Sequence, residues 1–155
     1  THYSAMIYFE DRYGREAAEK MIQTHLKMPY SLARMLGLAD APANLPASAY
    51  SNNMQYSAIV YGKGALYYDV MRRAVGDEAF FKSLRAYYAT YRGRLAEPRS
   101  FLDLVLANAP AAGAEALYRR WIEETHGDQD ISGSAIPGIQ QLLGEFLKTK
   151  GRVSP

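Results

Sequence analysis

The sequence predicts an all-α fold, a compact multi-helix domain of about seven helices. In successive segments the apolar residues recur every three or four positions, as they do on one face of a helix. No segment shows the strict alternation of apolar and polar residues that marks a half-buried strand. The chain has 155 residues, 48% of them hydrophobic, which is enough for one domain with its own core.

Charge and composition exclude several functional classes. The formal net charge is +2 and acidic and basic residues are interspersed, so the sequence indicates neither a nucleic-acid partner nor a polybasic membrane patch. No apolar run approaches the roughly 20 residues that span a bilayer. Cysteine is absent, which excludes disulfides, thiol catalysis and thiolate metal ligands. None of these features identifies a cellular compartment.

The first helices are expected in residues 1–13 and 15–28. A glycine follows the first of them, and Pro29 should end the second, because proline lacks an N–H group and disfavours helix in the residue before it. A short helix is expected around residues 32–36. Residues 37–53 are rich in proline, asparagine and serine, and they predict a long connection that is either an ordered functional loop or a partly mobile one.

The most informative helix is expected to begin at Asn52, which can cap it, with Gln55 three residues on as in a capping box. Gly62 and Gly64 lie inside this helix, where each costs about 1 kcal/mol relative to alanine. Two such glycines indicate that another backbone or a ligand approaches closely.

Three further helices are predicted toward the C-terminus. Asp77 is expected to cap one and Ser100 the next. Another helix should cover residues 114–126, and a last amphipathic helix residues 139–148.

The polar residues alone indicate no reaction. The three histidines are His2, His25 and His126, and no two are four positions apart, as a helical zinc-binding pair requires. His25 is expected to be structural or solvated, and His126 suits a helix end. Glu123 and Glu124 are adjacent and point to different sides of a helix, so they make a poor catalytic pair. There is no nucleophile elbow or phosphate-binding loop.

Four stretches nevertheless resemble, in order, the helical part of the catalytic domain in the membrane alanyl aminopeptidase family. These gluzincins are zinc metallopeptidases, and the similar part lies beyond their zinc site. The opening residues resemble the helix after the third zinc ligand, and the segment around Trp121 resembles a later one. The central pattern is Y-x-x-x-x-Y-x-K-G-A followed by G-D-E-x-F. It is matched here by Tyr56, Tyr61, Lys63, Gly64, Ala65, Gly76, Asp77, Glu78 and Phe80.

This resemblance implies a domain fragment. Residues 1–127 would be the helical part of a peptidase catalytic domain that lacks its zinc-binding half. Residues 128–155 resemble nothing in that family and form a tail with one amphipathic helix. The parent would be a zinc-dependent aminopeptidase, a hydrolase that acts on N-terminal peptide bonds. The chain itself would hold no cofactor, because zinc would be bound by an upstream part of the same polypeptide. It would be inactive in isolation and would self-associate through the surface that this upstream part covers.

The resemblance also assigns roles to individual residues. Tyr61 would donate its hydroxyl to the oxyanion of the tetrahedral intermediate, and Tyr56 would lie beside it in the substrate pocket. Lys63 is expected to be an exposed or ion-paired helix residue and not a catalyst. Gly62 replaces the glutamate that is usual in the family. No residue of the chain is expected to bind a metal.

Two alternatives remain for the sequence. Tyr61 shares a helix face with Gly64, Ala65 and Tyr68, and it could be an ordinary core tyrosine. The chain could likewise be a helical scaffold or protein-interaction module, or a catalytically dead relative of the peptidase.

Overall fold

The computed structural model describes residues 1–109 and 113–131, and within them the all-α prediction is confirmed. When helices that continue into one another are joined, these residues form seven helices and no strand. The predicted helix at residues 139–148 lies outside the described residues. The elements are α1 (His2–Tyr13), α2 (Arg15–Ile22), the π-helical turn η1 (Gln23–Lys27), α3 (Met28–Met35), the 3₁₀ turn η2 (Ala47–Ala49), α4 (Asn53–Tyr56), the π-helical segment η3 (Ser57–Lys63), α5 (Gly64–Val75), α6 (Asp77–Tyr91), α7 (Ser100–Asn108), α8 (Ala114–Tyr118), the π-helical turn η4 (Arg119–Glu123) and α9 (Gly127–Asp130).

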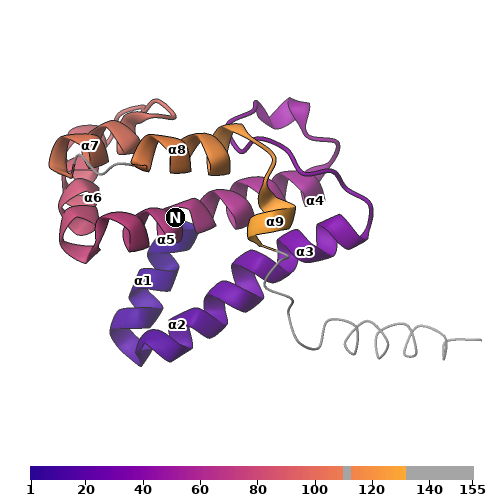
Figure 1. The fold of residues 1–155 in the computed structure, drawn as a ribbon, viewed down its shortest axis with the longest axis horizontal. Coiled ribbons are helices and arrows are strands. Elements are labelled where there is room, and N and C mark those ends of the chain that lie inside the picture. Colours follow the sequence, from indigo (N-terminus) through magenta and orange to yellow (C-terminus); the bar gives the residue numbers. More distant parts are fainter. Residues whose placement is uncertain (110–112, 132–155) are drawn as a thin grey trace, which may run out of the picture.

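One continuous helix, made of α4, η3 and α5, runs through the middle of the molecule (Figure 1). Helix α8 lies along one side of it and α1 and α2 lie on the other, while α6 and α7 close the end where α5 finishes. Segment η1 crosses η3 on the side opposite α8. The central helix therefore contacts elements from both halves of the chain: α1, η1, α3, α6, α8 and η4.

The core surrounds this central helix and is rich in aromatic residues. Phe80 and Phe101 pack edge to face with their ring centroids 5.6 Å apart, in the arrangement that aromatic quadrupoles prefer. The largest fully buried side chains come from six different elements and from the segment after α9: Tyr30, Lys63, Phe80, Leu26, Ile59, Met71, Leu102, Ile131, Val105 and Ser83. The chain through Ile131 therefore belongs to one packed body.

The prediction that Pro29 ends a helix is wrong. Helix α2, the π turn η1 and helix α3 follow one another without a break from Arg15 to Met35. A π turn interrupts the regular hydrogen-bond ladder of a helix, and Pro29 follows it in the first turn of α3. A proline is tolerated there because the N–H groups of a first turn need no partner within the helix.

The cap predicted at Asn52 is confirmed. The Asn52 side-chain oxygen accepts a hydrogen bond from the Gln55 backbone N–H at 2.9 Å. The Gln55 side chain reaches back and accepts from the Ser51 N–H at 2.7 Å, one residue earlier than the usual capping box requires. This double contact sets the start of the central helix.

The caps predicted at Asp77 and Ser100 are wrong. Helix α6 has Gly76 at its N-cap, and the Asp77 carboxylate instead accepts hydrogen bonds from Arg72 at 2.8 Å. Ser100 is already the first residue of α7, and its hydroxyl accepts from the Glu97 N–H at 2.9 Å, which closes the turn before the helix. In both cases a nearer partner takes the side chain that was expected to cap.

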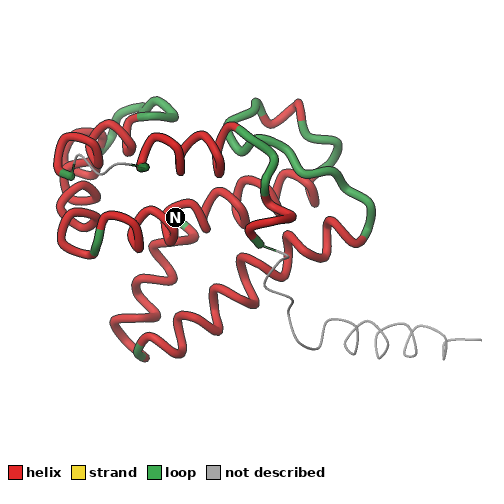
Figure 2. Tube along the Cα trace, in the orientation of Figure 1, coloured by secondary structure: helices red, strands yellow, loops and turns green. Residues whose placement is uncertain are grey.

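The stretch between α3 and α4, which includes the short 3₁₀ turn η2, contains the longest loop in the described residues (Figure 2). One side-chain bond joins it to α4, and another closes it on itself. The Gln55 side-chain amide donates to the Ala39 carbonyl at 2.8 Å, and the Tyr50 hydroxyl donates to the Pro42 carbonyl at 2.8 Å. Across residues 1–109 and 113–131, no helix is both long and apolar enough to cross a membrane.

Candidate functional site

Tyr61 lies in η3, where the central helix departs from regular α geometry. This π-helical segment is seven residues long, whereas most π-helices are single turns, often found at functional sites. Gly62, the residue after Tyr61, faces η1. A Cβ atom added to Gly62 would lie 2.9 Å from the Leu26 carbonyl oxygen. The expectation that these glycines permit close backbone approach is therefore confirmed at Gly62. At Gly64 an added Cβ would make only ordinary contacts.

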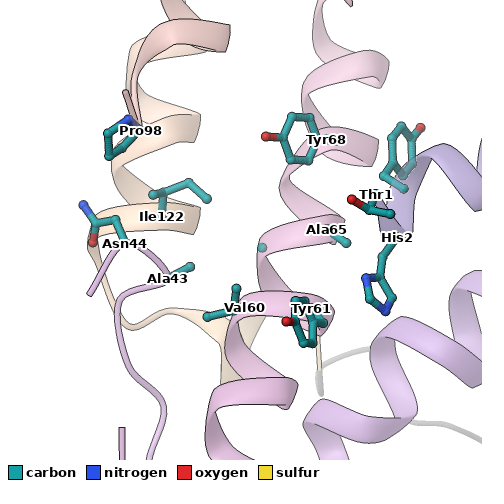
Figure 3. Close-up of a pocket in the computed structure, with 12 residues that line it drawn as sticks. Thr1, His2, Ala43, Asn44, Val60, Tyr61, Ala65, Tyr68, Pro98 and Ile122 are labelled. Carbon is teal, nitrogen blue, oxygen red and sulfur yellow. The ribbon is translucent and has the colours of Figure 1, made fainter. Parts of the chain in front are cut away.

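A hollow of about 390 Å³ opens beside Tyr61. Figure 3 shows two walls: Tyr61, His2, Ala65 and Tyr68 lie on one side, with Ala43, Asn44, Ile122 and Pro98 on the other. Its full lining comprises Thr1, His2, Tyr3, Ala43, Asn44, Val60, Tyr61, Gly64, Ala65, Tyr68, Pro98 and Ile122. The predicted shared face of Tyr61, Gly64, Ala65 and Tyr68 is thus one wall of this hollow.

The Tyr61 ring is held by two other rings. The His2 imidazole stacks on it with centroids 4.8 Å apart and planes 19° from parallel. The Tyr56 ring meets it edge-on at 5.4 Å and 79°. Tyr61 itself is 43% exposed, which argues against the interpretation of a core tyrosine. Tyr56 and Tyr61, the two residues that the resemblance singled out, are therefore in contact although they lie more than one helical turn apart along the chain.

The proximity of Tyr61 affects the ionisation of Tyr56. The Tyr61 hydroxyl raises the pKa of Tyr56, because a second phenol nearby disfavours the phenolate. Tyr56 therefore remains a neutral phenol at physiological pH. It is available as a hydrogen-bond donor and acceptor and not as a base.

His2 is a part of the site that sequence reasoning did not find. It belongs to the first turn of α1 and reaches Tyr61 only because α1 packs against the central helix. Sequence spacing contains no signal for this contact, since the two residues are far apart in the chain. His25, in contrast, is exposed, and His126 contacts the Glu124 carboxylate at 2.8 Å.

The opposite wall of the hollow is made of two chain segments bonded to each other. The Ala43 N–H donates to the Ile122 carbonyl at 2.7 Å. The first segment belongs to the long loop before α4 and the second to η4. This hydrogen bond makes the two segments one wall.

Lys63 lies two residues after Tyr61, and its side chain is fully buried. The expectation that Lys63 is ion-paired is confirmed, because its ammonium lies 3.1 Å from the Asp40 carboxylate. The alternative expectation, an exposed side chain, is wrong. Burial lowers the pKa of Lys63, and the negative charge of Asp40 opposes that shift. The sequence did not reveal the burial because Asp40 lies in a loop without periodicity.

The described residues do not form a site that fits a zinc ion. Among residues 1–109 and 113–131 no three histidine, aspartate, glutamate or cysteine side chains converge as metal ligands would. The chemistry that its own residues offer is that of a positioned tyrosine hydroxyl, on Tyr61, which can donate a hydrogen bond to an oxygen in the hollow.

Two curated proteins are similar to the chain in sequence. Aminopeptidase N of Lactococcus lactis subsp. lactis is 33% identical over 108 residues, which cover 66% of this chain and 12% of that protein. Aminopeptidase O of Homo sapiens is 25% identical over 92 residues, 56% of this chain and 11% of that protein. No protein-family model matches the chain, and no solved structure matches it. The chain thus spans about an eighth of the length of these relatives. Its distant, partial homology to aminopeptidases N and O is consistent with a fragment of that family.

Proposed function

We propose that the chain is part of an aminopeptidase, in which Tyr61 stabilises the oxygen of the scissile carbonyl as negative charge develops on it. The observation that carries the proposal is the setting of Tyr61, half-exposed in a hollow and fixed between the rings of His2 and Tyr56. The homology to aminopeptidases N and O supports it. So does the Y-x-K-G-A pattern in which Tyr61 lies.

The physical basis is a preorganised donor. A phenol held by its neighbours costs little reorganisation when the oxyanion forms, so its hydrogen bond is stronger in the transition state than with the substrate. A donor of this kind typically contributes on the order of 3 kcal/mol, about a hundredfold or more in kcat. Among the described residues, the lining of the hollow includes no carboxylate or lysine side chain.

The remaining chemistry belongs to other parts of the parent protein in this proposal. A zinc ion held upstream would supply the Lewis acid, and this chain would supply the helical wall that faces it, with Tyr56 beside the peptide substrate. The isolated chain would then have no activity. We also propose that the isolated chain self-associates through the surface that the upstream part covers in the parent protein.

The test is the hydrolysis of N-terminal residues from peptides by the full-length protein and by its Tyr61→Phe variant. We expect kcat to fall about a hundredfold with little change in KM, because the lost interaction belongs to the transition state. Tyr88→Phe is the matched control, because it also removes a phenol hydroxyl, but from an exposed tyrosine on α6 that lies outside the hollow. It should retain full activity.

Three outcomes would count against the proposal. Equal activity of the Tyr61→Phe and wild-type proteins would reduce Tyr61 to a packing residue. A rise in KM alone would make it a substrate contact without a role in the transition state. A full-length protein without peptidase activity would favour a helical scaffold or a catalytically dead relative.

A further inference from the structure

The ammonium of Lys63 connects three segments of the chain. It lies 3.1 and 3.2 Å from the two carboxylate oxygens of Asp40. It also donates to the Ala41 carbonyl at 3.0 Å and the Glu124 carbonyl at 2.7 Å. An ammonium has three N–H donors, so one carboxylate and two carbonyls satisfy all of them. No donor is left for water or substrate.

A second layer of bonds reinforces this junction. The Asp40 carboxylate accepts from the Gly127 N–H at 2.9 Å, and Ala43 bonds to Ile122 as described above. Gly127 packs directly on the Tyr30 ring and has no room for a side chain. The loop that contains residues 40–43 and the stretch that contains residues 122–127 are therefore fixed to each other and to the central helix.

These two stretches form the wall opposite Tyr61. Ala43 and Ile122 face the hollow from the far side (Figure 3). Tyr61 and Lys63 are two positions apart in η3, so the exposed side of that segment presents Tyr61 to the hollow while its buried side holds Lys63. The Lys63 bonds consequently attach the two stretches of the far wall to the same segment that carries Tyr61.

We propose that Lys63 is a positioning residue, whose buried ammonium holds the Ala43–Ile122 wall at a fixed distance from the Tyr61 hydroxyl. The inference deepens the proposed function and rests on it. An oxyanion donor acts only when it lies about 2.7–3.1 Å from the developing charge. A misplacement of about 1 Å can cost on the order of a hundredfold in rate. Substrate bound against the far wall would therefore lose the Tyr61 hydrogen bond if that wall moved.

Stability alone explains this lysine poorly. Removing two charges from water costs about as much as their attraction returns, so a well-packed apolar pair would give similar or greater stability. The ion pair adds direction instead. Each of its hydrogen bonds has a preferred distance and angle, which apolar contacts lack.

The experiment compares two double variants of the full-length protein. Lys63→Met/Asp40→Asn removes both charges without leaving either one buried and unpaired. The control, Lys20→Met/Glu16→Gln, removes an exposed lysine–carboxylate pair on α2. For each protein we would measure kcat and KM, with wild-type Tyr61 and with Tyr61→Phe. We would also measure amide hydrogen exchange in peptides that cover residues 39–44 and 122–127.

We expect faster exchange in both stretches only in the Lys63 variant. Its kcat should fall about tenfold or more with a smaller change in KM. In the Tyr61→Phe background the same substitutions should lower kcat less than about twofold, because effects carried by one shared interaction are not additive. If the double variant does not fold, Asp40→Glu is the second variant. It keeps both charges but lengthens one side chain by a methylene, and it should show the same two changes to a smaller extent.

The outcomes separate the inference from the proposed function. Unchanged amide hydrogen exchange in both stretches would overturn the inference that Lys63 holds them in place. Faster exchange with unchanged kcat would overturn the positioning role while leaving the peptidase assignment intact. So would a loss of kcat in the Tyr61→Phe background as large as the loss with wild-type Tyr61. A wild-type protein without activity would overturn the proposed function and the positioning role together, and the exchange data would still decide whether Lys63 joins the three segments.

Discussion

The two ends of the central helix are held by different forces. Where α5 meets α1, α6 and α7, aromatic rings fill the interior: Phe80 packs edge-on against both Phe101 and Tyr3. At the η3 end the contacts are a buried ion pair and a glycine against a backbone carbonyl. Apolar packing stabilises without a strong preference for direction, whereas hydrogen bonds fix distances and angles. The candidate site lies at the end that is fixed in direction.

The largest effect is expected at the aromatic end. Phe80→Ala should lower the free energy of unfolding by about 3–5 kcal/mol, because Phe80 is fully buried and its truncation leaves a cavity. Urea unfolding of the chain measures this. Tyr88→Ala, at an exposed position of the same helix, should change stability by less than about 0.5 kcal/mol. Comparable losses in both variants would contradict a core centred on Phe80.

At the η3 end, two glycines in the same helix should respond with opposite signs. Gly62→Ala should destabilise by about 1–3 kcal/mol, because its Cβ would lie 2.9 Å from the Leu26 carbonyl oxygen. Gly64→Ala should stabilise by up to about 1 kcal/mol, because its Cβ meets only ordinary contacts and alanine is the better helix former. Thermal or urea unfolding of both variants tests the pair. Stabilisation by both would show that η1 is not in close contact with η3.

A smaller effect is expected where the central helix begins. Asn52→Ala removes the acceptor for the Gln55 N–H and should cost about 1 kcal/mol. Asn53→Ala is the neighbouring control, since Asn53 is exposed and is not the capping residue. Its effect should stay within about 0.5 kcal/mol. Equal losses for the two asparagines would mean that the cap contributes nothing specific.

The smallest effect concerns pH. Arg72 lowers the pKa of Asp77 below its ordinary value of 3.8. A carboxyl group with a lowered pKa in the folded state stabilises the fold above its unfolded pKa, and this stability is lost as the pH falls through the folded value. The stabilities of wild type and Asp77→Asn should thus differ at pH 7 and converge below about pH 3.8. The difference should be modest because Asp77 is mostly exposed. Urea unfolding from pH 7 to pH 3 measures it, and a constant difference would contradict the pairing.

Local signals predicted much of the fold. The cap at Asn52 and the close approach at Gly62 follow from one residue and its immediate neighbours, and both are found in the structure. Pro29, Asp77 and Ser100 were misjudged for a common reason. Each has its expected local preference, but another feature decides its position. This feature is a π turn for Pro29, an arginine near the end of the preceding helix for Asp77, and a tight turn for Ser100.

The site was less predictable than the fold. Tyr61 and Tyr56 followed from a resemblance, and the structure places them side by side. The stack of His2 on Tyr61 and the bonds of Lys63 join residues far apart in the chain. Such contacts depend on how helices pack, which periodicity and capping signals do not report.

The contact between Gly62 and Leu26 also restricts how this sequence can change over generations. Any side chain at position 62 requires η1 to move away first, and η1 leads directly into Tyr30, on which Gly127 packs. A change to glutamate, the residue that the resemblance implies for this position, would therefore be disruptive as a single step. It becomes accessible only after substitutions elsewhere have separated the two segments. The order in which mutations arise, and not only their identity, thus limits which relatives this chain can give rise to.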